Sequence, residues 1–136
     1  VHRFVKHLVA ARLHFGRGRT DDDTLLALMQ KVQIGFGGVA PGALDDGPTS
    51  HSLALTRVSA TGAERFYLMV NAYWEALTFQ LPPAPAAASA SWQLWIDTNR
   101  PAPEDIHRWD AAPVVGATAY RVGPRSIVAL VANERA

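Results

Sequence analysis

The chain has 136 residues, of which 49% are hydrophobic and 18% are charged, and its formal net charge is +1. This length suits one domain, or one domain with a structured appendage. The absence of cysteine excludes a disulfide scaffold, a thiolate metal site and a cysteine nucleophile. The near-neutral charge argues against nucleic acid as a partner. No apolar stretch reaches the about 20 residues that span a bilayer, and nothing resembles a signal peptide, so we expect no membrane partner and a cytoplasmic location.

The first predicted element is a helix over residues 1–15, because apolar residues recur there every three or four positions. They are Val1, Phe4, Val5, Leu8, Val9, Ala11, Leu13 and Phe15. So broad an apolar face indicates a helix with more than one neighbour. We therefore expect the chain to be the tail of a longer protein, and its first helix to cause self-association when the other partner is missing.

A second helix is predicted to begin near Thr20, whose hydroxyl can cap it. Three aspartates at positions 21–23 place negative charge at the positive end of the helix dipole, which explains them better than a metal site does. The apolar stripe of this helix is Leu25, Leu28, Met29 and Val32.

From residue 33 onward the pattern changes to short extended runs separated by turn signals. The glycine-rich run 35–38 is followed by Pro41 rather than by a helix, which favours a turn over a phosphate-binding loop. Six strands are predicted at 53–56, 66–70, 77–81, 92–97, 120–122 and 127–132, with a possible seventh near Ile34. Residues 84–90, rich in alanine and proline, are predicted to form a surface loop.

These runs have no helices between them, which predicts a mainly β fold, an antiparallel β-sandwich with two N-terminal helices. We expect two units along the chain. Residues 1–32 would be a helical segment that ends a catalytic barrel missing upstream, and residues 33–136 would be the sandwich domain.

The search for catalytic chemistry predicts no catalytic residue, no metal site and no cofactor. No two of the five histidines have the i, i+4 spacing of a helical metal pair, and no serine stands in a GxSxG elbow. Two carboxylates, Glu75 and Asp97, lie in or beside strands rich in aromatic residues. Asp97 also suits a strand-to-turn exit, in which its side chain bonds nearby backbone.

The most unusual stretch is residues 71–75, Asn-Ala-Tyr-Trp-Glu, where a hairpin turn is expected and two large aromatic residues stand in place of glycine. An exposed aromatic face can stack on the C–H groups of a sugar, and a carboxylate beside it can accept sugar hydroxyls. Tyr73, Trp74 and Glu75 are therefore candidate carbohydrate-binding residues, and Trp95 is a further aromatic candidate. The alternative is that Tyr73 and Trp74 are buried at the end of the sandwich or against a neighbouring domain.

Five stretches carry a resemblance to a known family: 1–13, 52–56, 70–82, 95–98 and 120–128. The first resembles the last barrel helix of isoamylase-type glycogen debranching enzymes of the α-amylase superfamily, and the others resemble the C-terminal β-sandwich of the same enzymes. The run NAYWEALTFQLP, residues 71–82, is the most specific of them. The chain departs from the family at Ala76, where proline is usual, and at Phe36, where tryptophan is frequent.

The resemblance implies that the parent enzyme is a glycosidase that hydrolyses α-1,6-glucosidic branch linkages in glycogen-like glucans. The catalytic aspartate and glutamate of that family lie on the barrel, upstream of Val1, so no residue of this chain inherits their roles. The implied role is that of a non-catalytic C-terminal domain, which packs on and stabilises the catalytic barrel of the same polypeptide. Two other hypotheses stay open: an α-glucan-binding module that uses exposed aromatics, and a free-standing enzyme that would need Glu75 or Asp97.

Overall fold

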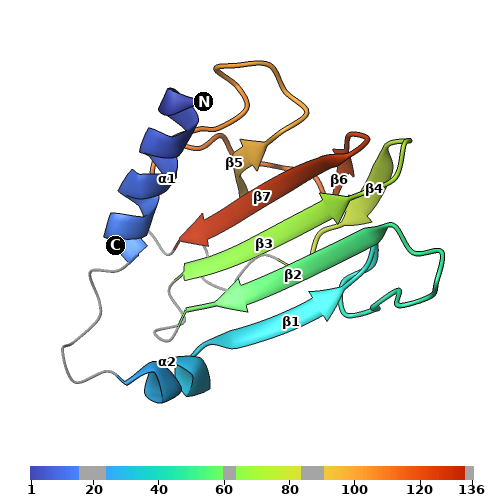
Figure 1. Ribbon diagram of the computed structural model, residues 1–136, viewed down its shortest axis with the longest axis horizontal. Coiled ribbons are helices and arrows are strands. Elements are labelled where there is room, and N and C mark those ends of the chain that lie inside the picture. Colours follow the sequence, from blue (N-terminus) through green and yellow to red (C-terminus); the bar gives the residue numbers. More distant parts are fainter. Residues whose placement is uncertain (16–23, 60–63, 84–90, 134–136) are drawn as a thin grey trace.

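The computed structural model describes residues 1–15, 24–59, 64–83 and 91–133. Two helices precede seven strands (Figure 1): α1 (His2–Phe15), α2 (Leu25–Lys31), β1 (Gln33–Gly37), β2 (Ser52–Val58), β3 (Glu64–Asn71), β4 (Leu77–Gln80), β5 (Gln93–Asp97), β6 (Ala119–Val122) and β7 (Ser126–Asn133). All six predicted strands are present, and so is the possible seventh near Ile34. The predicted helix cap at Thr20, the aspartates at 21–23 and the predicted loop at 84–90 lie outside the described residues.

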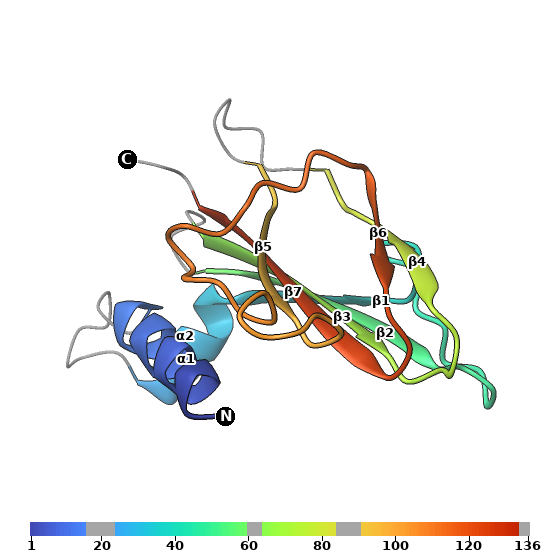
Figure 2. The ribbon, with the colours of Figure 1, turned by 90° about the horizontal axis from the view of Figure 1, so that it is seen from above.

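The seven strands form two antiparallel sheets, which confirms the mainly β, antiparallel class. One sheet has five strands in the order β1-β2-β3-β7-β5, and β4 pairs with β6 in a sheet of two strands. Figure 2 shows the β4–β6 pair on one side of the large sheet and both helices on the other side. The two faces of the large sheet therefore have different neighbours.

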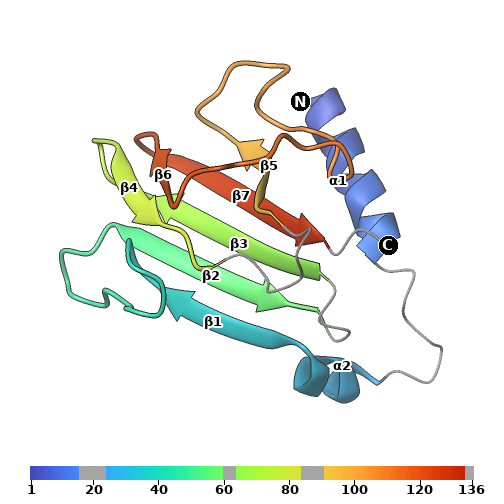
Figure 3. The same ribbon diagram turned by 180° about the vertical axis from the view of Figure 1, so that it is seen from behind.

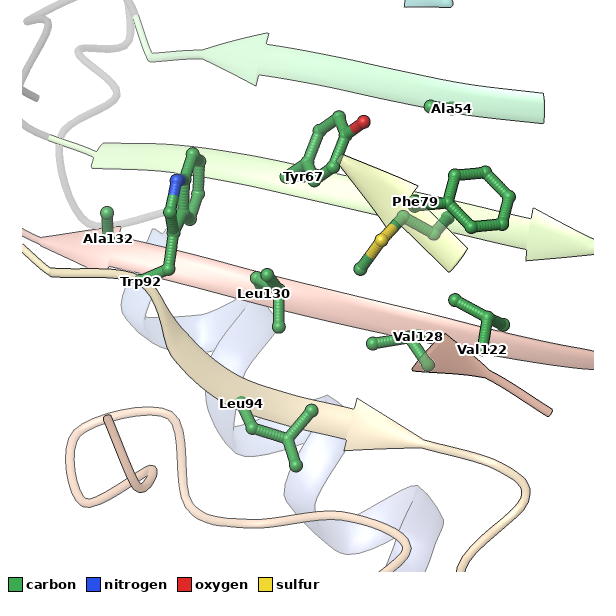
Figure 4. Packing of buried hydrophobic residues seen from close by; sticks show 10 residues of the cluster. Ala54, Tyr67, Phe79, Trp92, Leu94, Val122, Val128, Leu130 and Ala132 are labelled. Carbon is green, nitrogen blue, oxygen red and sulfur yellow. The ribbon is translucent and has the colours of Figure 1, made fainter. Parts of the chain in front are cut away.

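The main core lies between the two sheets and follows from the alternation of side chains along each strand. Every second residue of β3 faces the small sheet. The residues of β7 directly opposite them share that face, as partners in an antiparallel pair do. Phe79 from β4 and Val122 from β6 meet them from the other side, and both are fully buried (Figure 4). The cluster consists of Ala54, Tyr67, Met69, Phe79, Trp92, Leu94, Val122, Val128, Leu130 and Ala132.

Two aromatic side chains of this core also tie the large sheet to the end of β4 through their polar groups. The Tyr67 hydroxyl donates a hydrogen bond to the carbonyl of Gln80 over 3.2 Å. The Trp92 indole N–H donates to the carbonyl of Pro82 over 2.9 Å. Each ring buries its apolar surface without leaving its polar atom unpaired.

The opposite face of the large sheet carries a smaller cluster that includes Ile96, Ile106 and Ala129, with Phe4 of α1 packed against it. A register shift lies between Leu94 and Ile96 where β5 pairs with β7. Leu94 belongs to the core between the sheets, whereas Ile96, after the shift, belongs to the cluster on the helix side. Regular alternation would have placed Ile96 on the same face as Leu94, so the irregularity in β5 is what moves Ile96 to the helix side, next to Trp95.

Side-chain contacts at both ends of α1 hold the helix on this face. Near its start, Arg3 donates to the carbonyl of Ile106 over 3.2 Å and forms an ion pair with Asp105. Near its end, the ring of His14 stacks on that of Trp109, with 3.8 Å between the centroids. Neither described helix is long and apolar enough to cross a membrane.

The prediction of two N-terminal helices is wrong in extent, because the structure has a single helix of several turns, α1. The second predicted helix is reduced to the seven residues of α2, about two turns. It begins at Leu25 rather than near Thr20, since the Thr24 hydroxyl caps it by accepting the N–H of Ala27 over 3.2 Å. The strand β1, which pairs with β2 from Gln33, limits it at the other end.

The predicted turn in the glycine-rich run is also wrong over residues 35–37, which lie in β1 and pair with residues 54–56 of β2. The chain bends only after Gly37. A Cβ on Gly37 would lie 2.9 Å from the backbone nitrogen of Gly42, so the following loop can fold back closely only over a glycine.

Candidate functional site

The turn between β3 and β4 is built around the side chain of Asn71, which is only 1% exposed. Its amide nitrogen donates to the carbonyls of Glu75 and Gly123, each over 2.8 Å. Its amide oxygen accepts the N–H of Tyr73 over 2.9 Å. An asparagine side chain that bonds the backbone two residues ahead supports a turn without glycine. This is the physical reason why Tyr73 and Trp74 can occupy the turn.

Two further backbone hydrogen bonds hold the turn against neighbouring segments. The N–H of Arg125, between β6 and β7, donates to the carbonyl of Tyr73 over 3.0 Å. The N–H of Ala72 donates to the carbonyl of His51, the residue before β2, over 2.8 Å. The turn is therefore held by its own Asn71 and by two distant segments, the connection between β6 and β7 and the residue before β2.

Three aromatic rings gather at this turn. The rings of Tyr73 and Trp74 lie 4.1 Å apart between centroids and are tilted by 32°. The imidazole of His51 stacks on Tyr73, with 5.1 Å between centroids and 17° between planes, and lies 6.3 Å from Trp74. Tyr73 is half-buried, whereas Trp74 is 65% exposed. Trp74 is therefore not buried at the end of the sandwich, and its burial against a neighbouring domain stays an open alternative.

These rings line an open hollow of about 440 Å³. The volume lies within the range of about 300–1,000 Å³ that is usual for small-molecule sites. The other lining residues come from the connection before β2, from β2 and from β4: Val39, Asp45, Thr49, Ser52 and Leu77. The hollow therefore combines a large exposed aromatic ring, an apolar part and three polar side chains with hydroxyl or carboxylate groups.

The other two residues grouped with this site by sequence lie elsewhere. Glu75 is exposed and does not line the hollow, although its backbone carbonyl helps to fix the turn. Trp95 packs on the helix side of the large sheet, where its ring meets that of Phe66 edge-on at 6.0 Å. The structure brings together Tyr73 and Trp74 and leaves Trp95 on the other face.

Asp97 belongs to a buried network rather than to an open site. Its carboxylate accepts the Tyr120 hydroxyl over 2.8 Å, the Arg100 Nε–H over 3.3 Å and the backbone N–H of Asn99 over 3.0 Å. Burial of the Tyr120 phenol, together with its hydrogen bond to Asp97, raises the pKa of Tyr120 to about 12. The predicted strand-to-turn role of Asp97 is confirmed. Within the described ranges no group of three or more His, Asp or Glu side chains could hold a metal ion.

Sequence reasoning did not identify Asp45, Thr49 or His51 as members of the site. For His51, the sequence offered one signal of membership in the site: the expected pairing of the strands at 53–56 and 66–70. Ser52 pairs with Asn71 in the observed register, which brings His51 beside the turn that follows Asn71. The loop that carries Asp45 and Thr49 has no such partner, so only the folded chain brings it to the hollow.

Comparison with known proteins gives a partial structural likeness to glycoside hydrolases. No protein-family model matches the sequence, and no curated protein is detectably similar to it. An endoglucanase of glycoside hydrolase family 44 from Clostridium acetobutylium is similar in structure, with a TM-score of 0.43 and 19% identity over 62% of this chain and 17% of that chain.

A family 44 xyloglucanase from Paenibacillus polymyxa, solved with xyloglucan, has the same TM-score of 0.43 and the same 19% identity, again over 62% of this chain and 17% of that chain. A family 30 endoxylanase from Clostridium papyrosolvens has a TM-score of 0.39 and 12% identity, over 66% of this chain and 22% of that chain. The chain thus spans about a fifth of the length of each of these enzymes. The likeness concerns only the arrangement of part of the chain.

Proposed function

We propose that the chain is a non-catalytic β-sandwich domain of a glycoside hydrolase and that it packs on the catalytic barrel of the same polypeptide. In this proposal residues 1–32 belong with the barrel and residues 33–136 form the C-terminal domain. The observation that carries it is a broad apolar surface, formed by α1 and by the adjoining face of the large sheet, that no described part of this chain covers.

The sheet contributes to this surface unevenly. Phe36, Leu55, Leu68 and Ala129 are successive partners across β1, β2, β3 and β7, so their side chains share the helix-side face. Ala129, beside α1, is only 6% exposed, whereas Phe36 on the edge strand is 54% exposed. The apolar row continues beyond the part of the sheet that α1 covers.

The helix contributes its outward side. Phe4 packs against the cluster on the sheet and Ala11 is buried, whereas Val5, Val9 and Leu13 are exposed. Contiguous exposed apolar surface of this kind marks an interaction site. A barrel whose last helix is α1 would cover these side chains in the intact enzyme.

The parent activity in this proposal is hydrolysis of α-1,6-glucosidic branch linkages by an isoamylase-type debranching enzyme. It is supported by the run NAYWEALTFQLP at residues 71–82 and by the stretches that accompany it. A cytoplasmic location of the parent enzyme is part of the same proposal.

Sedimentation velocity of the purified chain tests the packing proposal. We expect concentration-dependent self-association through the uncovered surface, and a shift to monomer in Phe36→Lys and in Leu13→Lys. The control is Val114→Lys, since Val114 is as exposed as these residues but lies between β5 and β6. A monomeric wild-type chain in which the α1 amides exchange at the rates of an unfolded peptide would contradict the proposal.

A second candidate function is favoured by the exposed aromatic rings at the β3–β4 turn. The domain would bind α-glucan, with Tyr73 and Trp74 supplying the aromatic face and a carboxylate beside them accepting sugar hydroxyls. Glu75 is the carboxylate that the sequence puts there, and Asp45 is the one that lines the hollow. Trp74→Ala should lower the affinity for glucan without lowering the melting temperature. A lower melting temperature with unchanged affinity for glucan would mean that the two aromatics have a structural role instead.

A further inference from the structure

We propose that the hollow binds one neutral pyranose unit of a glucan, which stacks on Trp74 and donates its hydroxyl hydrogens to Asp45. Tyr73 and His51 act as positioning residues that hold the indole. This assignment rests on the second candidate function and goes beyond it, because it gives separate roles to residues from two distant segments of the chain.

Trp74 is the ring on which a sugar can stack. Tyr73 lies against it at 4.1 Å, yet 65% of Trp74 remains exposed. His51 in turn stacks on Tyr73 at 5.1 Å, so the indole rests on a neighbour that is itself supported. A ring held in place before binding loses less side-chain entropy when a ligand arrives. A single exposed indole accommodates one sugar ring.

Asp45 is the carboxylate positioned to accept hydroxyl groups. One of its oxygens accepts the N–H of Gly47 over 3.4 Å, which orients the side chain in its loop. Its other oxygen has no hydrogen-bond partner among the described residues, and the side chain lines the hollow. Glu75 follows Trp74 directly in the chain but does not line the hollow. Hydrogen bonds to a charged acceptor are about twice as strong as neutral ones.

The charge of the lining selects a neutral ligand. The eight lining residues include one carboxylate and neither lysine nor arginine. A phosphate or an acidic sugar would meet like charge without a compensating cation. Recognition of a quaternary ammonium ion typically uses a cage of several aromatic rings, whereas this hollow is open. A polyhydroxylated neutral ring satisfies both the stacking face and the free acceptor.

The site lies at the opposite end of the large sheet from the two helices, and α1 forms the helical part of the surface proposed to face a barrel. Figures 1 and 3 show α1 and α2 at one end of the large sheet and the turn between β3 and β4 at the other end. A glucan could therefore occupy the hollow while the apolar surface is covered. Trp74 and Asp45 are not among the residues of that surface, so substituting them leaves its side chains unchanged.

The test is a titration of the purified chain with maltoheptaose, followed by tryptophan fluorescence and by calorimetry. We expect saturable binding by the wild-type chain, and affinities lower by about tenfold or more in Trp74→Ala and in Asp45→Asn. The matched control is Asp46→Asn, because Asp46 is the adjacent exposed carboxylate and does not line the hollow. Circular dichroism of each variant verifies that it is folded.

The outcomes separate this assignment from the function on which it rests. If Trp74→Ala abolishes binding while Asp45→Asn binds like the wild type, the glucan site stands and the role of Asp45 is overturned. If Glu75→Gln lowers the affinity for maltoheptaose and Asp45→Asn does not, the role assigned to Asp45 is overturned and Glu75 is the acceptor. Two results would overturn both the assignment of the hollow and the glucan-binding function: the folded wild-type chain binds no maltoheptaose, or it binds tetramethylammonium instead. Neither result affects the packing proposal.

Discussion

The side-chain amide of Asn71 donates a hydrogen bond over 2.8 Å to the carbonyl of Gly123, which lies 52 positions further along the chain. This bond joins the end of β3 in the large sheet to the end of β6 in the small sheet. The same side chain shapes the turn that carries Tyr73 and Trp74. The stability of the sandwich and the geometry of the candidate site thus depend on one buried residue.

Replacing Asn71 by alanine should destabilise the domain by about 3 kcal/mol, because several buried backbone groups lose their partner at once. Urea denaturation measures the loss, and the emission spectrum of Trp74 should shift as the turn relaxes. Gln80→Ala is a suitable control, since this side chain is exposed on β4 and should change stability by no more than about 0.5 kcal/mol. An Asn71→Ala variant as stable as the control would mean that water replaces the side chain at no cost.

The pair formed by Tyr120 and Asp97 should make stability fall at high pH. Burial and the hydrogen bond to Asp97 raise the pKa of Tyr120 to about 12 from its usual 10.0. The unfolded chain therefore loses this proton first, so the stability contributed by the neutral phenol is complete below pH 10 and is lost as the pH rises towards 12.

Denaturation midpoints measured across this range should fall more steeply for the wild-type chain than for Tyr120→Phe. Tyr67, whose pKa burial also raises, adds to the slope in both proteins. At pH 7 the variant should be less stable by about 1 kcal/mol, the usual contribution of one hydrogen bond. Parallel curves for the two proteins would show that Tyr120 does not titrate differently in the folded state.

The two phenylalanines of the edge strands should respond very differently to truncation. Phe79 is fully buried between the sheets, so Phe79→Ala should cost about 3–5 kcal/mol. Phe36 is 54% exposed on β1, and Phe36→Ala should cost less than about 1 kcal/mol at concentrations at which the chain is monomeric. Chemical denaturation compares them directly. A similar cost for both would mean that the helix-side face is covered in solution, for instance by a second copy of the chain.

Arg3→Ala should loosen α1 without affecting the sheet. Arg3 bonds the carbonyls of Pro103 and Ile106 and pairs with Asp105, and it thereby ties the first turn of the helix to the connection after β5. Native-state hydrogen exchange should show protection in residues 2–15 reduced by roughly tenfold, with protection in β3 and β7 unchanged. A reduction of equal size throughout the chain would indicate instead that α1 unfolds only together with the sheet.

Most of the secondary structure could be predicted from the sequence, because each element carries its own local signal. The alternation in β4 and the apolar run in β3 indicate strands whatever their partners are, and the spacing of apolar residues over 1–15 indicates a helix. The start of α2 was missed because two hydroxyl residues, Thr20 and Thr24, can both act as caps. Thr24 accepts the N–H of Ala27 and begins the helix.

The sequence by itself determined the mainly β antiparallel class, the run of aromatics after Asn71 and the excess apolar surface of the first helix, since all three follow from the order of neighbouring residues. Only the tertiary structure decided which of these aromatics share a site. Trp95 lies on the helix side because its neighbour Leu94 faces the core between the sheets, and His51 and Asp45 reach Trp74 because the pairing of β2 with β3 and a folded-back loop bring distant residues together. Contacts between residues far apart in the chain depend on register and loop closure, and neither is encoded in a local pattern.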